Sequence, residues 1–285
     1  MEIKQAAVIG AGVMGSDIAM HLACHGFSVI LKDLTDDILG KAKANIKKSY
    51  RLAKLMKKNE ILPSLEEILT RIKFTLDYES FDQVDLVIEN IPEVYEQKAS
   101  LYREMGRICK DETIYGTNTS CISITRIGRL MPRPENVIGM HFLNPAHLKN
   151  LVEVIIGYHT SDETVQKVKS FLRSIGKTWV IVNDFPGFVT NRVLMVTINE
   201  AIWVVHDKVA APQDVDKIFT LGFSYKMGPL ATADLIGLDT ILNSLLELYG
   251  SYNDSKFRPC PLLKKMVDAG LLGRKSGKGF FEYRL

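Results

Sequence analysis

The stretch that decides the fold of the first part of the chain is QAAVIGAGVMGSDIAMHLACHGFSVILKDL, residues 5–34. An apolar run at 6–9 predicts a strand, an apolar helical pattern follows it, and a second apolar run at 27–31 predicts another strand. Between the first strand and the helix stand three glycines in the spacing G-x-G-x-x-G: Gly10, Gly12 and Gly15. The stretch therefore predicts the first strand–helix–strand unit of a doubly wound sheet.

The glycine spacing predicts a dinucleotide site, whereas a lone glycine turn without a ligand is the plainer alternative. The first glycine permits a tight turn, the second lets the backbone approach a pyrophosphate, and the third lets the helix pack against the strand. Asp33 ends the second strand, where a carboxylate accepts hydrogen bonds from a ribose and repels a 2′-phosphate. We predict NAD rather than NADP, although Lys32 softens this repulsion, and we include Val13 and Met14 in the site.

Apolar runs and amphipathic runs alternate through the rest of the first part of the chain. The further strands are expected at 72–76, 84–89, 113–116, 137–140, 151–155 and 179–182, with helices at 36–57, 94–108 and 162–175. This alternation predicts an α/β fold with a Rossmann-type doubly wound sheet. Ligands of such sheets bind beyond the carboxyl ends of the strands. Four polar residues that follow strands are therefore expected in the cofactor crevice: Asn118, Thr119, Ser120 and His141.

The pattern changes at Pro186 and Gly187, where turn-forming residues interrupt the chain. Helical runs follow at 188–205, 212–221, 235–248 and 262–269. We predict a Rossmann domain at 1–184 and an all-α domain at 185–285. The apolar faces of these helices are either a dimerisation surface or the core of the second domain.

His141 and Glu153 lie in HFLNPAHLKNLVEVI, residues 141–155, and this local stretch alone does not decide their role. A lone histidine is more often a hydrogen-bonded structural residue than a catalyst. Glu153, however, lies within an apolar strand, where an ionised carboxylate is costly to bury without a partner. No comparable carboxylate is evident in sequence for the other histidines, which we expect to be structural or exposed: His21, His25, His147, His159 and His206.

Composition excludes several classes of protein. The chain has 285 residues, a net charge of +3 and 46% hydrophobic residues, which is typical of a globular protein and not of a nucleic-acid binder. No apolar run approaches the roughly 20 residues of a membrane span, and no leader pattern begins the chain. Four scattered cysteines without metal-type spacing indicate a reducing compartment and no metal site. We expect a cytoplasmic protein.

A basic run follows Asp33 and is either a solvated helix face or a site for an anionic ligand. Its members are Lys41, Lys43, Lys47, Lys48, Arg51, Lys54, Lys57 and Lys58.

Taken together, the motifs resemble the 3-hydroxyacyl-CoA dehydrogenase family along the whole chain. The matching segments are GAGVMG, the NTS of TNTSCISIT, HFLNP with the later LVEV, DFPGFVTNR, MGPLATADLIGLD and GRKSGKGF. The resemblance implies that NAD-dependent chemistry interconverts a 3-hydroxyacyl thioester and its 3-oxoacyl form. His141 would be the general base and Glu153 its partner, while Ser120 and Asn191 would contact substrate oxygens. The resemblance also implies cofactor contacts for Glu93, Lys98, Asn144 and Lys275. From the apolar helix faces we expect a homodimer formed through the C-terminal domain.

Two departures from the family pattern concern the acyl carrier. The family commonly has an apolar VPVMK-type segment after HFLNP, whereas this chain has AHLKN. In relatives the helix after Asp33 contacts coenzyme A; Ser49 matches one such position, and Met56 stands where a basic residue is expected, beside Lys57. An acyl-CoA and an acyl carrier protein of polyketide extender-unit biosynthesis both remain possible. A catalytically inactive nucleotide-binding protein is a third alternative, and a lysine-dependent hydroxyacid dehydrogenase would need lysine where the chain has Asn191.

Overall fold

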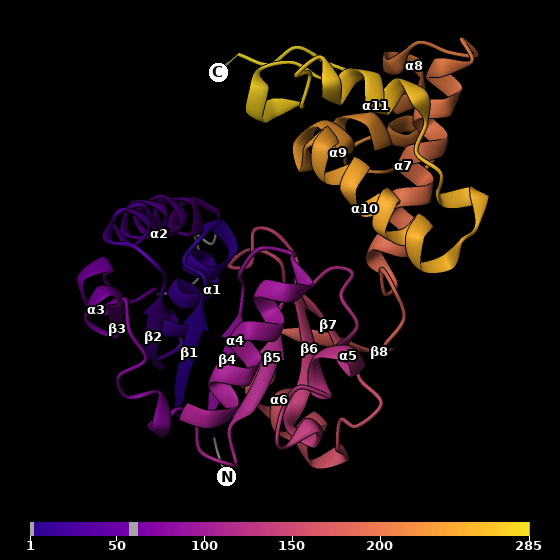
Figure 1. Cartoon of the computed structure of the whole chain (residues 1–285). Coiled ribbons are helices and arrows are strands. Elements are labelled where there is room, and N and C mark those ends of the chain that lie inside the picture. The colour runs from indigo at the N-terminus through magenta and orange to yellow at the C-terminus, as the bar shows by residue number, and fades with distance from the viewer. Residues whose placement is uncertain (1–2, 57–61, 285) are drawn as a thin grey trace. The chain divides into compact units, whose positions relative to one another are not determined.

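The structure, a computed structural model, describes residues 3–56 and 62–284. The chain forms two compact units, Met1–Asp184 and Phe185–Leu285 (Figure 1). Each unit has a hydrophobic core of its own.

The first unit is built on one sheet of eight strands in the order β3-β2-β1-β4-β5-β6-β7-β8. The strands are β1 (Gln5–Ile9), β2 (Ser28–Lys32), β3 (Ile72–Thr75), β4 (Leu86–Glu89), β5 (Ile114–Thr117), β6 (Val137–Phe142), β7 (Leu151–Ile156) and β8 (Thr178–Asn183). The six strands β1 to β6 are parallel to one another. Their apolar runs are buried on both faces, as expected for strands between two helical layers.

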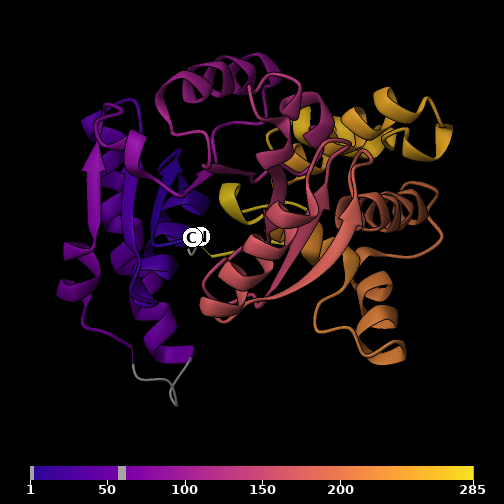
Figure 2. The same ribbon diagram turned by 90° about the horizontal axis from the view of Figure 1, so that it is seen from below.

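Helices cover both faces of this sheet (Figures 1 and 2). They are α1 (Val13–Cys24), α2 (Asp36–Met56), α3 (Leu65–Thr70), α4 (Tyr95–Ile108), α5 (Ile124–Gly128) and α6 (Asp162–Ser174). One core cluster joins α1, α2, α3 and α6 to one face of the strands. On the other face, α4 packs its Tyr102 ring against Tyr115 of β5. Two short helices, α3 and α5, were not expected from the periodicity of the sequence.

The last two strands run against the other six. β7 is antiparallel to β6, and β8 is parallel to β7. The cause is the length of the β6–β7 connection, residues 143–150, because a parallel crossover needs about a dozen or more residues. Side chains alternate between the faces of a strand. Met140 and Phe142 point into the α1 layer, so His141 projects from the face that α4 covers.

The second unit is helical. Its helices are α7 (Thr190–His206), α8 (Pro212–Lys217), the π-helix η3 (Ile218–Gly222), α9 (Pro229–Ile236), α10 (Leu238–Tyr252) and α11 (Pro261–Asp268). The expected single helix at 235–248 was wrong at its start, since Gly237, with φ +106°, separates α9 from α10. The predicted fold class is confirmed: a Rossmann-type α/β sheet followed by a helical C-terminal part. No helix in the described part of the chain is long and apolar enough to cross a membrane.

Candidate active site

His141 and Glu153 are directly opposite each other in the antiparallel β6–β7 ladder. The Nδ1 atom of His141 lies 2.6 Å from Oε2 of Glu153, and the two side chains are 9% and 2% exposed. Opposed side chains of an antiparallel pair project from the same face within contact distance. The pairing predicted from the motifs is therefore a consequence of strand register.

Ser120 stands on the other side of the His141 ring. Its Oγ lies 3.1 Å from Nε2 of His141. The hydroxyl, the imidazole and the Glu153 carboxylate form a row, with the Ser120 oxygen at Nε2 and a Glu153 oxygen at Nδ1. Ser120 does not cap a helix, because Ser123 accepts from Arg126 N at the start of α5.

Glu93 organises the backbone around Ser120. One carboxylate oxygen, Oε1, accepts hydrogen bonds from the backbone N–H groups of Ser120 and Cys121, both at 3.0 Å, and from the Thr119 hydroxyl. Burial opposes ionisation of this carboxyl group, but the nearby ammonium of Lys98 and the donated hydrogen bonds outweigh it and hold the pKa of Glu93 below its ordinary value. Ionised Glu93 thus fixes the loop that presents the serine hydroxyl.

Lys98 is buried beneath this loop. Its side chain is 0% exposed, and its Nζ donates to both carboxylate oxygens of Glu89, at 2.7 and 2.8 Å. The same ammonium lies 3.4 Å from Oε2 of Glu93. Thr117 also donates to Glu89, at 2.7 Å. This geometry favours an indirect role for Lys98 in orienting Glu93; the predicted direct contact of either residue with the cofactor stays a prediction.

A chain of contacts joins the glycine loop after β1 to the histidine strand. The backbone of Asn90, after β4, lies against Gly10, where a Cβ would come within 2.6 Å of its carbonyl oxygen. Asn118, after β5, donates to the Asn90 side chain at 2.6 Å and accepts from Phe142 N at 3.0 Å. The glycine loop and His141 therefore share the carboxyl edge of the sheet, where doubly wound folds bind ligands.

The glycine loop has the geometry that a pyrophosphate requires. Gly10 has φ +96°, which favours glycine, and a Cβ on Gly15 would lie 1.7 Å from the Gly10 carbonyl oxygen. A Cβ on Gly12 would meet no atom within 4 Å, so the space over this peptide is open. Val13, 64% exposed, and Met14 then begin α1. The residues fit a dinucleotide phosphate held at the helix N-terminus.

Asp33 stands at the end of β2 beside this loop. Its Oδ2 accepts a hydrogen bond from Ala11 N at 2.5 Å, and its Oδ1 accepts from Leu34 N at 2.6 Å. Lys32, in contrast, is buried, and its Nζ lies 4.5 Å from the centre of the Tyr78 ring. The carboxylate of Asp33 is thus fixed at the glycine loop, where a ribose contact remains the prediction.

Several predicted site residues lie elsewhere in the chain. Asn144 is exposed in the β6–β7 connection, and Asn191 is half-buried in the first turn of α7 in the second unit. Lys275 pairs with Asp239 of the same unit at 2.6 Å. Their approach to a cofactor or substrate stays a prediction. Among residues 3–56 and 62–284, no group of three or more His, Cys, Asp or Glu is arranged to hold a metal ion.

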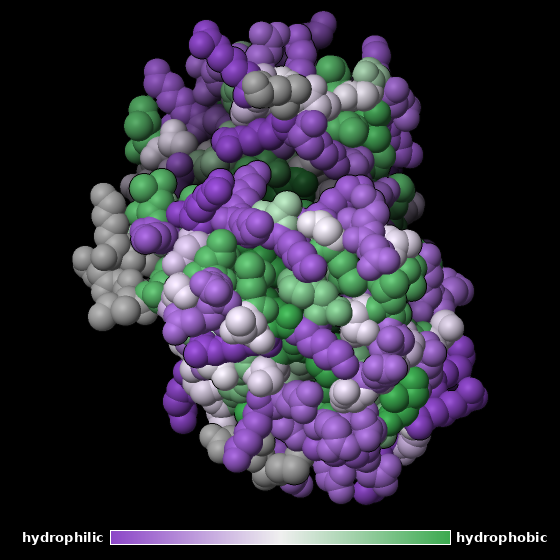
Figure 3. All heavy atoms as spheres, turned by 90° about the vertical axis from the view of Figure 1, so that its left-hand side faces the viewer, coloured by the Kyte–Doolittle hydropathy of each residue, from purple (hydrophilic) through white to green (hydrophobic). Residues whose placement is uncertain are grey.

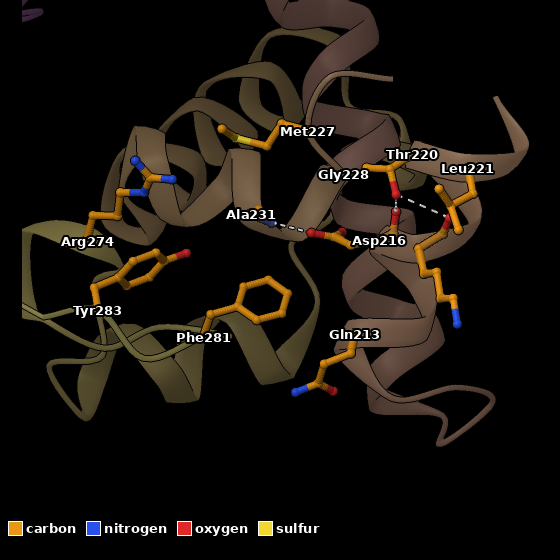
Figure 4. Close-up of a pocket in the computed structure, with 11 residues that line it drawn as sticks. Gln213, Asp216, Thr220, Leu221, Met227, Gly228, Ala231, Arg274, Phe281 and Tyr283 are labelled. Carbon is orange, nitrogen blue, oxygen red and sulfur yellow. Dashed lines mark hydrogen bonds between the residues drawn. The ribbon is translucent and has the colours of Figure 1, made fainter. Parts of the chain in front are cut away.

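A pocket of about 530 Å³ lies in the second unit. Arg274, Phe281 and Tyr283 line one part of it and Asp216 and Thr220 another (Figure 4). Asp216 accepts from Leu230 N and Ala231 N at the start of α9. Burial raises the pKa of this carboxyl group in spite of those bonds. The carboxylate therefore serves as a helix cap.

The described part of the basic run, from Lys41 to Lys54, lies on α2, on the side of the first unit shown in Figure 3, where hydrophilic and apolar surface alternate. Ser49 is half-buried on this helix, and the last turn also exposes Leu55 and Met56. Lys57 and Lys58 lie outside the described residues. This face of α2 therefore combines positive charge with exposed apolar side chains.

A second buried histidine–carboxylate pair was not expected from the sequence. His147 Nδ1 lies 2.5 Å from Oδ1 of Asp17, and the two residues are 2% and 3% exposed. His147 is thus buried and hydrogen-bonded, within the expectation of a structural or exposed residue, but its carboxylate partner was not foreseen. The polar segment AHLKN, which stands where the family commonly has apolar residues, indicated that His147 has an unusual environment. It did not indicate the partner, because Asp17 in α1 is 130 positions away in the chain.

A Rossmann-type unit that carries a glycine loop and a histidine–carboxylate pair on one sheet edge defines an NAD-dependent dehydrogenase. Residues 5–185 match the model of the 3-hydroxyacyl-CoA dehydrogenase NAD binding domain, and residues 187–283 match that of the C-terminal domain. The chain belongs to the 3-hydroxyacyl-CoA dehydrogenase family, and its cofactor is NAD.

Proteins of similar sequence and structure match this chain along nearly its full length. A probable 3-hydroxybutyryl-CoA dehydrogenase of Deinococcus radiodurans is 49% identical over 276 residues, 97% of this chain and 99% of that protein. One from Bacillus subtilis is 46% identical over 284 residues, 99% of this chain and 98% of its own length. The crystal structure of (S)-3-hydroxybutyryl-CoA dehydrogenase from Ralstonia eutropha superposes with a TM-score of 0.92 at 37% identity, covering 100% of both chains.

Proposed function

We propose that this protein interconverts a 3-hydroxyacyl-CoA and the corresponding 3-oxoacyl-CoA with NAD, with a short acyl chain of the 3-hydroxybutyryl kind. The observation that carries the proposal is the row of Ser120, His141 and Glu153 at the edge that also holds the glycine loop. The names of the full-length relatives support the acyl group and the CoA carrier.

His141 is proposed to move the proton of the substrate alcohol. Because Nδ1 faces the Glu153 carboxylate at 2.6 Å, Nδ1 keeps a hydrogen, and the lone pair of Nε2 is directed to the side of the Ser120 hydroxyl. The carboxylate also stabilises the imidazolium that forms when Nε2 accepts the proton. General base catalysis of this kind contributes about 10²–10⁴ in rate. NAD supplies the hydride acceptor when it is bound.

Ser120 and Asn191 are proposed to bind the substrate oxygens. The Ser120 hydroxyl lies 3.1 Å from Nε2 of His141, so an oxygen bound to this hydroxyl is also within reach of the ring. A donor aimed at that oxygen stabilises negative charge as it develops. Asn191 is assigned the same kind of contact from the second unit by its position in the family motif.

The cofactor is proposed to lie across Gly10, Gly12 and Gly15, with Val13 and Met14 at the helix start and Asp33 on the ribose. Asn118, Asn144 and Lys275 are proposed near its nicotinamide half, with Glu93 held for that contact by Lys98. The conformation of Gly10 and the open space over Gly12 support the pyrophosphate position.

A carrier-protein thioester is the second candidate substrate. The exposed basic residues of α2 suit an acidic carrier protein by charge, and they suit the phosphates of CoA equally well. Ser49 on the same helix and Lys57 are the positions assigned to the carrier. A homodimer formed through the second unit is also proposed, because Val209, Leu221 and Phe223 of that unit are 75%, 75% and 66% exposed.

The test compares one acyl group on two carriers. Oxidation of NADH is followed by absorbance with acetoacetyl-CoA and with acetoacetyl carrier protein at equal concentration. We expect kcat/KM to be at least tenfold higher with the CoA ester, and we expect the His141→Ala variant to be nearly inactive with both. Higher kcat/KM with the carrier protein would establish the second candidate. Firm NADH binding with no turnover of either ester would support an inactive nucleotide-binding protein.

A further inference from the structure

The second histidine–carboxylate pair holds two parts of the first unit together. The Asp17 carboxylate accepts from both the ring and the backbone of one residue: Nδ1 of His147 lies 2.5 Å from Oδ1, and the His147 N–H donates to Oδ2 at 3.1 Å. Both residues are buried. The carboxylate thereby fixes the position of the His147 backbone as well as the direction of its ring.

The two partners belong to the two elements that the proposed reaction must align. Asp17 lies in the second turn of α1, the helix that begins directly after Gly12 of the dinucleotide loop. His147 lies in the connection 143–150, which leaves β6 just after His141 and enters β7 just before Glu153. A displacement of α1 against this connection would change the distance between bound cofactor and catalytic base.

Other buried polar contacts tie the same elements to their neighbours. Lys177, before β8, donates from Nζ to the carbonyl oxygens of Ala146 and Lys149, at 2.6 and 2.8 Å. His21, one turn after Asp17 on α1, lies with Nε2 2.9 Å from the Ile175 carbonyl oxygen. Directional hydrogen bonds in an apolar layer fix one arrangement, whereas apolar contacts alone tolerate sliding.

We propose that Asp17 and His147 are positioning residues, which hold the cofactor helix α1 in register with the strands that carry His141 and Glu153. This inference rests on the proposed function. Neither residue touches the reacting atoms; they act through the placement of the cofactor relative to the base. The AHLKN segment of this chain then affects alignment of the site and not the choice of acyl carrier.

The experiment compares Asp17→Ala, His147→Ala, the double variant and His147→Asn. In His147→Asn the amide nitrogen can replace Nδ1 as donor to Asp17, so this variant is the conservative rescue. Asp85→Ala is the matched control, because Asp85 is a buried carboxylate that accepts from Lys4 N and Gln5 N at the start of β1, at the opposite edge of the sheet. Melting temperature, the Kd of NADH by fluorescence, and kcat and KM with acetoacetyl-CoA are measured for each.

We expect both alanine variants to lower kcat about tenfold, less than the roughly 100-fold that a 1 Å misplacement costs, and to raise the Kd of NADH several-fold. The double variant should be no worse than either single variant, since the two side chains act as one unit. His147→Asn should stay within about twofold of the wild type. Asp85→Ala should lower the melting temperature similarly and leave kcat and Kd unchanged.

The proposal is overturned if the alanine variants melt like Asp85→Ala but keep wild-type kcat and NADH affinity. If a single variant does not fold, the double variant decides, because removing both partners leaves no unpaired buried charge. Failure of the proposed function is distinguishable: the wild type would then reduce no 3-oxoacyl thioester. In that case NADH affinity alone tests the pair, and an unchanged Kd in the double variant rejects it.

Discussion

Two histidine–carboxylate pairs lie on opposite faces of one sheet. His141 contacts Glu153 at 2.6 Å in the layer of α4, and His147 contacts Asp17 at 2.5 Å in the layer of α1. All four residues are buried, and in both pairs the carboxylate meets Nδ1. Distance and burial therefore do not distinguish the proposed catalytic pair from the proposed positioning pair.

The pairs differ at the other ring nitrogen. Nε2 of His141 has the Ser120 hydroxyl at 3.1 Å, whereas Nε2 of His147 is buried without a hydrogen-bond partner among the described residues. A base needs a path for its proton, and a hydroxyl at the sheet edge provides one. The environment of the second ring nitrogen is therefore the feature that distinguishes the proposed base from the proposed positioning residue.

The same substitution in both pairs gives the largest contrast. We expect His141→Asn to lower kcat by about 10²–10⁴, the usual contribution of a general base, with NADH affinity retained. His147→Asn should keep nearly full activity. Steady-state kinetics with acetoacetyl-CoA and NADH measures both, and equal losses in the two variants would break the comparison.

Substitution of Glu153, the carboxylate of the first pair, is expected to lower turnover less than substitution of His141. Glu153→Gln keeps the size of the side chain but no longer favours the imidazolium, so we expect turnover to fall about 10- to 100-fold, part of the general-base contribution. NADH binding, measured by fluorescence, should be unchanged because Glu153 lies on the β7 side of the histidine. Full activity of this variant would mean that the ring needs no carboxylate.

Asp33→Ala changes the proposed cofactor site and leaves both histidine–carboxylate pairs intact, so it separates cofactor selectivity from the roles of the two pairs. Loss of the carboxylate removes its repulsion of a 2′-phosphate, so we expect the preference for NADH over NADPH to fall about tenfold or more. The ratio of kcat/KM values for the two reduced cofactors measures this effect. A constant ratio would place cofactor selectivity in other residues.

Asp85 is a buried carboxylate that contacts neither pair, and its substitution is expected to change stability alone. Burial tends to raise its pKa, but the hydrogen bond from Lys110 and those from Lys4 N and Gln5 N outweigh burial and hold the pKa of Asp85 below its ordinary value. Such a group stabilises the fold above the unfolded pKa of about 3.9, and this stability is lost as pH falls through the lowered folded value.

We therefore expect Asp85→Asn to cost about 1 kcal/mol of unfolding free energy at pH 7, the worth of a typical hydrogen bond. The difference from wild type should shrink as acid protonates the wild-type carboxylate. Urea unfolding at pH 7 and at pH 3 measures both values. A difference that does not depend on pH would contradict the lowered pKa, and a loss of activity at pH 7 would disqualify Asp85 as a control.

Much of the first unit could be predicted from sequence, because parallel strands and the glycine loop have strong local patterns. Every predicted strand appears in the sheet, and the glycine loop follows β1. The contact of His141 with Glu153 was carried by the family resemblance, yet the short 143–150 connection already indicated an antiparallel pair. That signal alone would have placed the two residues in adjacent strands.

Other features depend on contacts between distant segments. The bond between Asp17 and His147 joins residues 130 positions apart, and no periodicity of one sequence predicts such a partner. Lys98 was expected at the cofactor because of its motif position, and only the packing of α4 on β4 brings its ammonium to Glu89. The break at Gly237 was missed because apolar residues continue across it.

The antiparallel ladder of β6 and β7 has a consequence for divergence within the family. Backbone hydrogen bonds set the pairing of His141 with Glu153, and a slip of either strand by one residue would turn its member of the pair to the opposite face. Engineered chimaeras with a relative should therefore take β6, the 143–150 connection and β7 from one parent, so that the register and both members of the acid–base couple are transferred together.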